Sequence, residues 1–409
     1  MLYYINMKSI NILGCEVSDL SNAEALARVK NYIEDAHQHY IVTPNPEIVL
    51  KAQKDKNLKL ILNHADLALP DGFGLKIAGK ILGQNPHNRI TGADFTESII
   101  SLSEQERWPI FLLGGKDEKI AEQAAWHLRY KYKNAKIVGT ASGGVIEFKQ
   151  GRWWTSDEKL LQKINESRAK IIFVGFGCPK QEKWIFQNLD KLPNVKLAMT
   201  IGGTLDFFAG ERKRAIYVLR KIGLEWLWRL IQEPKRFKRI WNATAIFLWT
   251  AIKWRARMTF KYRENVAAFI ININNEVLLV KRKETKKDHW QIPQGGIDQG
   301  EDIEKALLRE VKEETGTSDV EIIGMHPDYH VYDWPEWHQL NGGYKGQKQT
   351  IFYLKYNGNG SDIKVDQREI DDFTWIYIDD VVETGHNVRK DMLEMAVEGY
   401  REIMQSEKI

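Results

Sequence analysis

Short apolar runs alternate with amphipathic stretches over the first 210 residues of the chain. A turn containing Gly or Pro follows each run, and the runs lie at 40–43, 65–69, 109–113, 170–174 and 197–201. Between them, apolar residues recur at helical spacing, and Ser21 with Glu24 has the pattern of a capping box that starts a helix. The alternation predicts an α/β fold in which helices cover both faces of a mostly parallel sheet.

The hydrophobic period changes near residue 265. Residues 266–283 hold two apolar runs around an Asn-rich turn, which predicts a β-hairpin, and residues 240–261 are predicted to form a helix. The 409 residues are enough for two or three domains. We expect a first domain at 1–239 with a helical appendage at about 210–239, a basic and aromatic helical linker at 240–262, and a second domain at 263–409.

Positive charge is concentrated in the stretch from 210 to 263. Between Glu211 and Arg239 ten Lys or Arg stand against three Glu, whereas the net charge of the whole chain is only +4. The apolar run at 241–254 is shorter than the ~20 residues that a bilayer span requires. Cationic helices with Trp and Phe suit an anionic membrane interface, which is the interpretation we favour. A packed helix with a solvated face and a nucleic-acid-binding surface are the alternatives.

Cysteine content and the N-terminal residues indicate a compartment. The two cysteines offer neither a disulfide framework nor a metal cluster, which fits a reducing cytosol. Residues 1–14 lack the long apolar core of a signal peptide. We therefore expect a cytoplasmic protein that is peripheral on the inner face of the cell membrane.

Short motifs, most of which contain glycine, lie at the ends of the predicted strands. The carboxyl ends of parallel strands form the ligand-binding edge of such sheets, and glycines let backbone amides approach a phosphate closely. No motif is a GxGxxG with a downstream acid or a P-loop, so binding of NAD or ATP is not indicated. The motifs lie at 43–45, 70–74, 89–92, 113–115, 175–182 and 202–206.

As a set, these motifs resemble those of the WecG/TagA/CpsF family, glycosyltransferase family 26, over residues 10–239. The resemblance implies a Rossmann-like, inverting transferase that moves an N-acetylmannosamine-type sugar from a UDP donor. The implied acceptor is N-acetylglucosamine on a polyprenyl diphosphate, in the synthesis of teichoic acid or surface polysaccharide. It also implies no metal cofactor for the transferase, and association into a homo-oligomer. Ile216 stands where family members usually carry Pro, which bears on the hinge into the appendage.

The resemblance also implies roles for single residues. Asp71 matches the catalytic base that deprotonates the acceptor hydroxyl, although Asp before Gly is also a common turn residue. Arg89 matches a residue that could stabilise the leaving diphosphate, with a surface salt bridge as the alternative. The other implied substrate contacts are Thr43 and Asn45 in the pocket, Gln181 with Glu182 at the nucleotide or sugar, and Arg214, Arg220 and Arg229 of the appendage at the lipid diphosphate.

A short acidic motif follows the predicted hairpin. Glu310, Glu313 and Glu314 stand at i, i+3 and i+4, so on a helix their carboxylates share one face. Carboxylates at that density bind Mg²⁺ or Mn²⁺, which can bridge a substrate diphosphate. An acidic helix with a solvated face is the alternative.

With Gly295, Glu301 and Arg309, this spacing matches the Nudix box, and the resemblance covers residues 265–405. It implies a mixed sheet between helices and metal-dependent hydrolysis of a nucleoside diphosphate linked to another group, with Glu313 both ligand and catalytic residue. Residues 290–297 and 346–349 resemble the branch of RNA pyrophosphohydrolases and diadenosine-tetraphosphate hydrolases. In that branch Glu369 matches a metal-binding or base residue and Lys348 could contact a phosphate. A solvated charge is the alternative for both.

Together the two halves predict a bifunctional enzyme that uses a sugar nucleotide and a second nucleotide substrate. The main alternative is a Nudix domain that only senses a nucleotide and regulates the transferase. Intact glutamates in the box argue against it, because a pure sensor need not keep metal ligands. A third interpretation, an RNA-processing enzyme with a scaffolding first domain, is disfavoured by the full set of transferase motifs.

Overall fold

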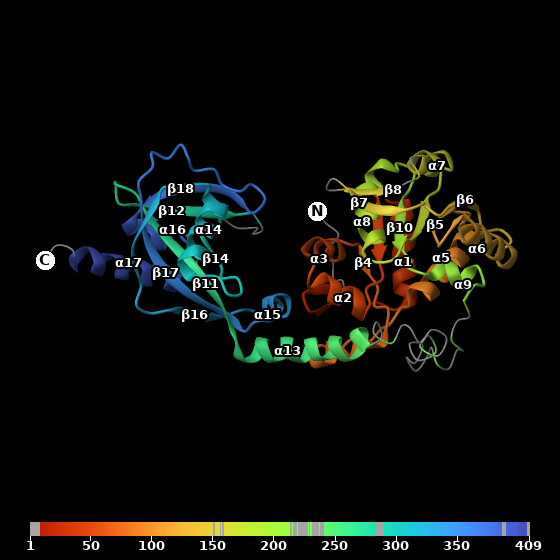
Figure 1. Cartoon of the computed structure of the whole chain (residues 1–409), viewed down its shortest axis with the longest axis horizontal. Helices are drawn as coiled ribbons and strands as arrows, with labels where there is room; N and C mark the ends of the chain where they lie inside the picture. The colour runs from red at the N-terminus through yellow and green to blue at the C-terminus, as the bar shows by residue number, and fades with distance from the viewer. Residues whose placement is uncertain are drawn as a thin grey trace. The chain divides into compact units, whose positions relative to one another are not determined.

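The computed structural model describes residues 9–149, 152–155, 157, 159–212, 215, 219, 228, 230, 237, 241–283, 290–386 and 390–406. The chain divides into two compact units (Figure 1). Unit 1 comprises Met1–Arg255 with Leu340–Gly343, and unit 2 comprises Ala256–Gln339 with Tyr344–Ile409.

Unit 1 is built on a six-stranded sheet in the order β4-β3-β10-β9-β5-β6, and every pairing in it is parallel. This confirms the predicted parallel α/β architecture, although β4 keeps only two residues of the run predicted at 65–69. Two antiparallel pairs, β1 with β2 and β7 with β8, lie outside this sheet. The strands are β1 (Ser9–Ile12), β2 (Cys15–Ser18), β3 (His39–Val42), β4 (Leu67–Ala68), β5 (Ile110–Gly114), β6 (Ile137–Ala141), β7 (Ile146–Lys149), β8 (Arg152–Thr155), β9 (Ile171–Gly175) and β10 (Leu197–Thr200).

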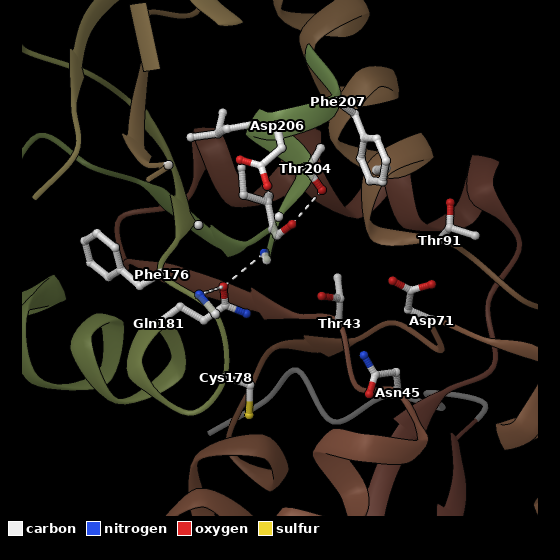
Figure 2. A pocket seen from close by; sticks show the side chains of 18 of the residues that line it. Thr43, Asn45, Asp71, Thr91, Phe176, Cys178, Gln181, Thr204, Asp206 and Phe207 are labelled. Carbon is white, nitrogen blue, oxygen red and sulfur yellow. Dashed lines mark hydrogen bonds between the residues drawn. The ribbon is translucent and has the colours of Figure 1, made fainter. Parts of the chain in front are cut away.

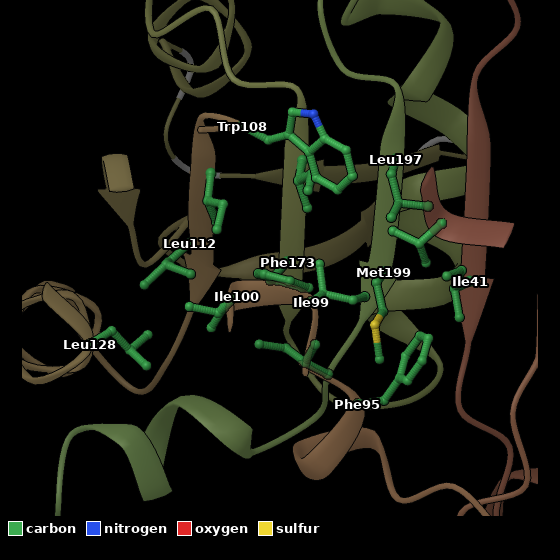
Figure 3. Packing of buried hydrophobic residues seen from close by; sticks show 14 of the residues in the cluster. Ile41, Phe95, Ile99, Ile100, Trp108, Leu112, Leu128, Phe173, Leu197 and Met199 are labelled. Carbon is green, nitrogen blue, oxygen red and sulfur yellow. The ribbon is translucent and has the colours of Figure 1, made fainter. Parts of the chain in front are cut away.

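Helices cover both faces of this sheet, because alternate strand residues point to opposite sides. On one face Phe173 and Leu112 pack with apolar residues of α1 (Asn22–Glu34), α5 (Gly92–Glu106) and α6 (Glu118–Lys131) (Figure 3). On the other face Phe111 and Val174 pack with α7 (Leu160–Glu166) and α8 (Lys180–Asn188). The remaining helices of unit 1 outside the linker are α2 (Pro46–Ala52), α3 (Lys56–Asn63), α4 (Phe73–Ile81), α9 (Thr204–Phe208) and a 3₁₀ turn at Leu189–Lys191, as far as the described residues show.

The predicted capping box starts α1. The Ser21 hydroxyl accepts from the Glu24 backbone N–H at 3.2 Å, and the Glu24 carboxylate accepts from the Ser21 N–H at 2.7 Å. Two of the donors that the helix leaves unpaired at its start are satisfied in this way. Ala25, Val29 and Ile33 then form the buried stripe of the helix.

The predicted linker helix is present. A π-helical segment at Asn242–Ile246 runs into α13 (Phe247–Phe260). Among the described residues no helix is both long enough and apolar enough to cross a membrane. Most of the predicted appendage at 210–239, including Arg214, Arg220 and Arg229, lies outside the described residues.

Unit 2 contains the predicted hairpin, in which β11 pairs antiparallel with β12. The mixed sheet runs β13-β12-β11-β17-β15, with β14, β16 and β18 pairing at its sides, and β11 lies parallel to β17. Its strands are β11 (Tyr262–Ile271), β12 (Glu276–Arg282), β13 (Trp290–Gln291), β14 (Gln294–Gly296), β15 (Val320–Met325), β16 (His330–Asp333), β17 (Gly346–Tyr356) and β18 (Ile370–Tyr377).

The faces of this second sheet are covered by different helices. Val266 and Phe352 pack with α14 (Ile303–Thr315) on one face, whereas Phe269 and Tyr353 pack with α17 (Lys390–Ser406) on the other. This sandwich confirms the predicted mixed α/β fold. Shorter helices are a 3₁₀ turn at Ile378–Asp380, α16 (Val381–Thr384) and α15 (Glu336–Gly342), whose last three residues are assigned to unit 1.

A buried histidine at the start of β3 makes the stability of unit 1 depend on pH. Nδ1 of His39 lies 2.8 Å from Oδ1 of Asp66, and Nε2 lies 3.0 Å from Oδ2 of Asp35. Burial lowers the pKa of His39, but the hydrogen bonds and charges of Asp66 and Asp35 outweigh burial and raise the pKa overall. The imidazolium is therefore favoured in the folded state, and its stabilisation is lost as pH rises through the folded-state pKa.

We expect His39→Gln to destabilise unit 1 by roughly 2 kcal/mol below pH 6.5 and by less at higher pH. Urea unfolding, followed by hydrogen exchange in peptides around β3, measures the difference. The exposed His37 nearby provides a control, because His37→Gln should leave the pH dependence intact. Equal pH slopes in His39→Gln and the unmodified protein would refute the assignment.

Candidate active sites

A cavity of about 360 Å³ opens at the carboxyl ends of the parallel strands in unit 1. Loops that follow β3, β5, β9 and β10 supply much of its wall (Figure 2). Four of the residues expected to contact substrate line this cavity: Thr43, Asn45, Asp71 and Gln181. Parallel pairing thus brings together motifs that are separated by more than a hundred residues in the sequence.

Asp71 is positioned by the loop that leaves β4. Its backbone N–H donates to the Pro44 carbonyl at 2.9 Å, and the Ile90 N–H donates to the Pro70 carbonyl at 3.1 Å. Gly72 follows with φ +121°, a conformation that favours glycine, and begins the turn into α4. Figure 2 shows the Asp71 carboxylate grouped with Thr43 and Asn45 on one side of the cavity, away from Phe176.

Thr43 and Asn45 also hold the wall in place. The Thr43 hydroxyl donates to the Thr200 carbonyl at 3.3 Å and so joins the ends of β3 and β10. The Asn45 side-chain oxygen accepts from the Ile48 N–H at 3.0 Å and caps α2. Each residue therefore has a structural contact in addition to the expected contact with substrate.

Gln181 is almost fully buried at the start of α8. Its side-chain oxygen accepts from the N–H groups of Gly177 at 3.2 Å and Gly202 at 3.0 Å. Glu182 accepts from the Gln181 amide nitrogen at 2.8 Å and is itself 1% exposed. Glu182 does not line the cavity, so the structure does not support the direct substrate contact expected of it.

Charged residues for which the sequence predicted no role also line the cavity. Lys116, Asp206 and Arg212 line it, and Arg212 pairs with Asp206 at 3.2 Å. Asp206 ends one of the glycine motifs and Lys116 directly follows another. The neighbouring glycines are therefore the sequence feature that could have indicated their place at the cavity. Cys178 also lines the cavity, and burial raises the pKa of its thiol, which disfavours the nucleophilic thiolate.

Arg89 and the arginines of the appendage are not brought to this cavity by the described structure. Arg89 is half-buried and does not line it. Arg214, Arg220 and Arg229 lie outside the described residues. Their expected contacts with phosphates stay predictions.

The acidic face of unit 2 lies on α14. Glu314 is buried, and one of its carboxylate oxygens accepts from the Gln294 N–H at 3.0 Å. Burial raises the pKa of Glu314 to about 7, although Arg282 and the Gln294 N–H act in the opposite direction. Burial likewise raises the pKa of Glu310, against the nearby Arg309. The fold thus holds two carboxyl groups where their negative charge is disfavoured.

Arg309 orients the carboxylates around it. It forms a two-pronged ion pair with Glu301, with both N–O distances 2.8 Å, and it lies 2.6 Å from Glu310 and 3.4 Å from Glu313. These hydrogen bonds lower the pKa of Glu301 to about 2. Among the described residues no three His, Cys, Asp or Glu side chains are gathered closely enough to hold a metal ion.

The donor set nevertheless fits a divalent cation. Oxygen ligands are those that Mg²⁺ and Mn²⁺ prefer, and a cation would offset the cost of burying the charges of Glu310 and Glu314. Gly295 leaves room for this arrangement, because a Cβ atom there would lie 1.8 Å from the carboxyl carbon of Glu310. Close contact with the Glu310 carboxyl group thus explains why Gly295 of the Nudix box is a glycine.

Glu369 and Lys348 have different surroundings. Glu369 is exposed and pairs with Arg282 at 3.2 Å, and Arg282 also lies 3.9 Å from Glu314. Tertiary structure therefore brings Glu369 near the acidic face through a shared arginine. Lys348 stacks over the ring of Tyr329 at 3.7 Å, so its ammonium group has a contact that the sequence did not predict.

The two units define an enzyme with a Rossmann-like transferase domain and a Nudix domain. A model described as the glycosyl transferase WecG/TagA/CpsF family matches residues 10–261, and a NUDIX domain model matches residues 261–396. Because the first match covers more than half of it, the chain belongs to the WecG/TagA/CpsF family of glycosyl transferases. The predicted pairing of a glycosyltransferase with a Nudix hydrolase domain is confirmed.

Curated relatives match the first part of the chain. Two proteins named N-acetylglucosaminyldiphosphoundecaprenol N-acetyl-beta-D-mannosaminyltransferase, from Staphylococcus aureus strains MRSA252 and MW2, are each 29% identical over 255 residues. The matches cover 62% of this chain and 96% of each relative. Among solved structures, a C. elegans Ap4A hydrolase binary complex matches 32% of this chain and 93% of its own, with 20% identity and a TM-score of 0.27.

We expect Gly295→Ala to weaken Mn²⁺ binding by about 10- to 100-fold, because the new methyl group displaces the Glu310 carboxylate. Electron paramagnetic resonance titration of free Mn²⁺ measures the affinity without requiring a substrate. Glu310→Gln should give a similar loss, whereas Glu304→Gln, an exposed change in the first turn of α14, should give none. Unchanged Mn²⁺ affinity in Gly295→Ala would show that Glu310 does not bind the ion from this position.

Proposed function

We propose that unit 1 transfers an N-acetylmannosamine-type sugar from a UDP donor to N-acetylglucosamine on a polyprenyl diphosphate. The observation that carries this proposal is the cavity in which Asp71 lies beside Thr43 and Asn45 at the carboxyl ends of the strands. The names of the two Staphylococcus relatives support the sugar and the acceptor. Such a reaction serves the synthesis of teichoic acid or surface polysaccharide.

Asp71 is the proposed general base. Its carboxylate takes the proton from the acceptor hydroxyl as that oxygen attacks the anomeric carbon of the donor sugar. The bond from the anomeric carbon to the donor diphosphate breaks in the same step, UDP leaves, and the configuration at that carbon inverts. The backbone hydrogen bond to Pro44 holds the base beside the sugar site.

The departing UDP carries negative charge that the protein has to stabilise. Lys116 and Arg212 line the cavity and are suited to this task by their charge. Arg89 and the appendage residues Arg214, Arg220 and Arg229 are proposed for the donor and lipid diphosphates. We also propose, as the resemblance to the family implies, that sugar transfer needs no metal ion.

We propose that unit 2 hydrolyses a nucleoside diphosphate linked to another group. Glu310, Glu313 and Glu314 would hold Mg²⁺ or Mn²⁺, which when bound neutralises a substrate diphosphate and lowers the pKa of a water molecule. Glu369, close to Glu314 through Arg282, is proposed to accept a proton from the attacking water. Lys348 is proposed to contact a phosphate once it leaves the ring of Tyr329.

We propose a peripheral position on the cytoplasmic face of the membrane, where the lipid acceptor would be met. Exposed apolar side chains on α13 support this: the exposed fraction is 56% for Trp249, 46% for Ile252 and 78% for Phe260. Lys253 is exposed on the same helix, and no acidic residue occurs between 234 and 263. Self-association into a homo-oligomer remains part of the proposal through the resemblance to the family.

Asp71→Asn should lower kcat for sugar transfer by about 10²- to 10⁴-fold with little change in the affinity for UDP, because the amide keeps the shape but cannot take the proton. Chromatography of released UDP, with a short-chain lipid-diphosphate N-acetylglucosamine as acceptor, gives the rate. Asp190→Asn is the control, since Asp190 is exposed and does not line the cavity. A variant at Asp71 with near-normal kcat would exclude it as the base.

Glu313→Gln should abolish Mg²⁺-dependent hydrolysis by unit 2 and leave sugar transfer unchanged. A panel of diadenosine tetraphosphate, 5′-triphosphorylated RNA and UDP-sugars tests this, with products separated by ion-exchange chromatography. If the unmodified protein binds such nucleotides but hydrolyses none of them, the sensing role for unit 2 would replace the proposed hydrolysis.

A further inference from the structure

One buried amide joins two loops of the proposed donor site. The side-chain oxygen of Gln181 accepts from the N–H of Gly177, which follows β9, and from the N–H of Gly202, which follows β10. Both glycines line the cavity, and both have positive φ, +76° and +55°. The position of each loop therefore depends on where the Gln181 oxygen is held.

The other end of the same amide is held by Glu182. The Gln181 amide nitrogen donates to Oε1 of Glu182 at 2.8 Å. If the amide turned over, its NH₂ group would face the two glycine N–H donors and its oxygen would face a carboxyl group. The two glycine N–H donors and the Glu182 oxygen that accepts from the amide nitrogen together favour the orientation in which the Gln181 oxygen faces the loops.

Burying Glu182 costs more free energy than burying an apolar residue that would only fill the same space. Glu182 is 1% exposed, and besides Gln181 the side-chain hydrogen-bond partner of its carboxyl group is the Cys178 thiol, a weak donor that does not satisfy Oε2. A buried oxygen left without a full hydrogen bond costs roughly 1–3 kcal/mol. Burial also raises the pKa of Glu182, so the neutral acid is favoured. An apolar side chain of similar size would pack here at lower cost, so packing alone does not explain a carboxyl group.

We propose that Glu182 is a positioning residue for the donor site, which fixes the Gln181 amide and through it the Gly177 and Gly202 loops in the shape that binds UDP. The inference rests on the proposed function, since that function assigns the cavity to a UDP-sugar. Glu182 does not touch the substrate in this account. It acts only as a hydrogen-bond acceptor behind the wall of the cavity.

Two substitutions separate the acceptor role from packing. Glu182→Gln keeps an oxygen that can accept from Gln181, so its dissociation constant for UDP should stay within about twofold of the unmodified value. Glu182→Met has similar volume but no such acceptor, so its dissociation constant should rise about tenfold. Removal of the buried carboxyl should leave Glu182→Met at least as stable to urea as the unmodified protein. A residue with only a structural role would not lose affinity while keeping stability.

Calorimetric titration with UDP gives the affinities, and hydrogen exchange of peptides over 175–182 and 200–206 reports on the loops without ligand. Faster exchange in Glu182→Met but not in Glu182→Gln is expected. The control is Asn188→Leu, which removes another buried polar group of α8, hydrogen-bonded to the Trp184 carbonyl, and should change neither readout.

Equal UDP affinity in Glu182→Met and the unmodified protein would overturn the proposal, and so would an equal loss in Glu182→Gln and Glu182→Met. Failure of the unmodified protein to bind UDP would instead count against the proposed function. In that case the exchange measurement still decides whether Glu182 holds the loops.

Discussion

The in-register parallel pairing of β3, β10, β9 and β5 is the constraint on which the transferase half depends. Met199 pairs with Ile41 of β3, Thr200 with Val174 of β9, and Val174 in turn with Leu113 of β5. These strands therefore end at nearly the same level, and the loops that follow them meet at one edge. A slip of one residue would exchange the two buried faces of the slipped strand and separate the loops joined by Gln181.

Unit 2 depends on a different balance, between burial and charge along one helix. Leu307 and Val311 anchor α14 against the sheet, while on the same helix Glu314 is buried and Glu310 is half-buried. Arg309 and Arg282 limit the resulting electrostatic cost, and a divalent cation would limit it further. The carboxyl groups whose burial costs free energy in the folded protein are those that would suit the helix to hold a divalent cation.

Much of this could be predicted from the sequence, because the signals are local. Period and turn residues predicted five of the six strands in the parallel sheet, all but β6, and also the capping box. Helical spacing put the three glutamates on one helix. The hydrogen bond between the side chains of Gln181 and Glu182 could not be predicted, because the sequence does not reveal which of two adjacent residues faces a cavity. The same applies to Lys116 and Arg212, whose approach to the cavity depends on long-range packing. The role of Glu369 was predicted only from the resemblance to the Nudix family. Its ion pair with Arg282 depends on tertiary structure and could not be predicted from the sequence.

The central claim is that the cavity of unit 1 transfers a sugar and that the chain also holds a separate hydrolase. Product analysis of the full chain with UDP-N-acetylmannosamine and Mg²⁺, with and without a lipid-diphosphate N-acetylglucosamine acceptor, tests it most directly. The account predicts UDP and a lipid-linked disaccharide only when acceptor is present. Absence of the disaccharide from a folded protein that receives both substrates would contradict the account. UMP formed without acceptor would identify the sugar nucleotide as a substrate of unit 2.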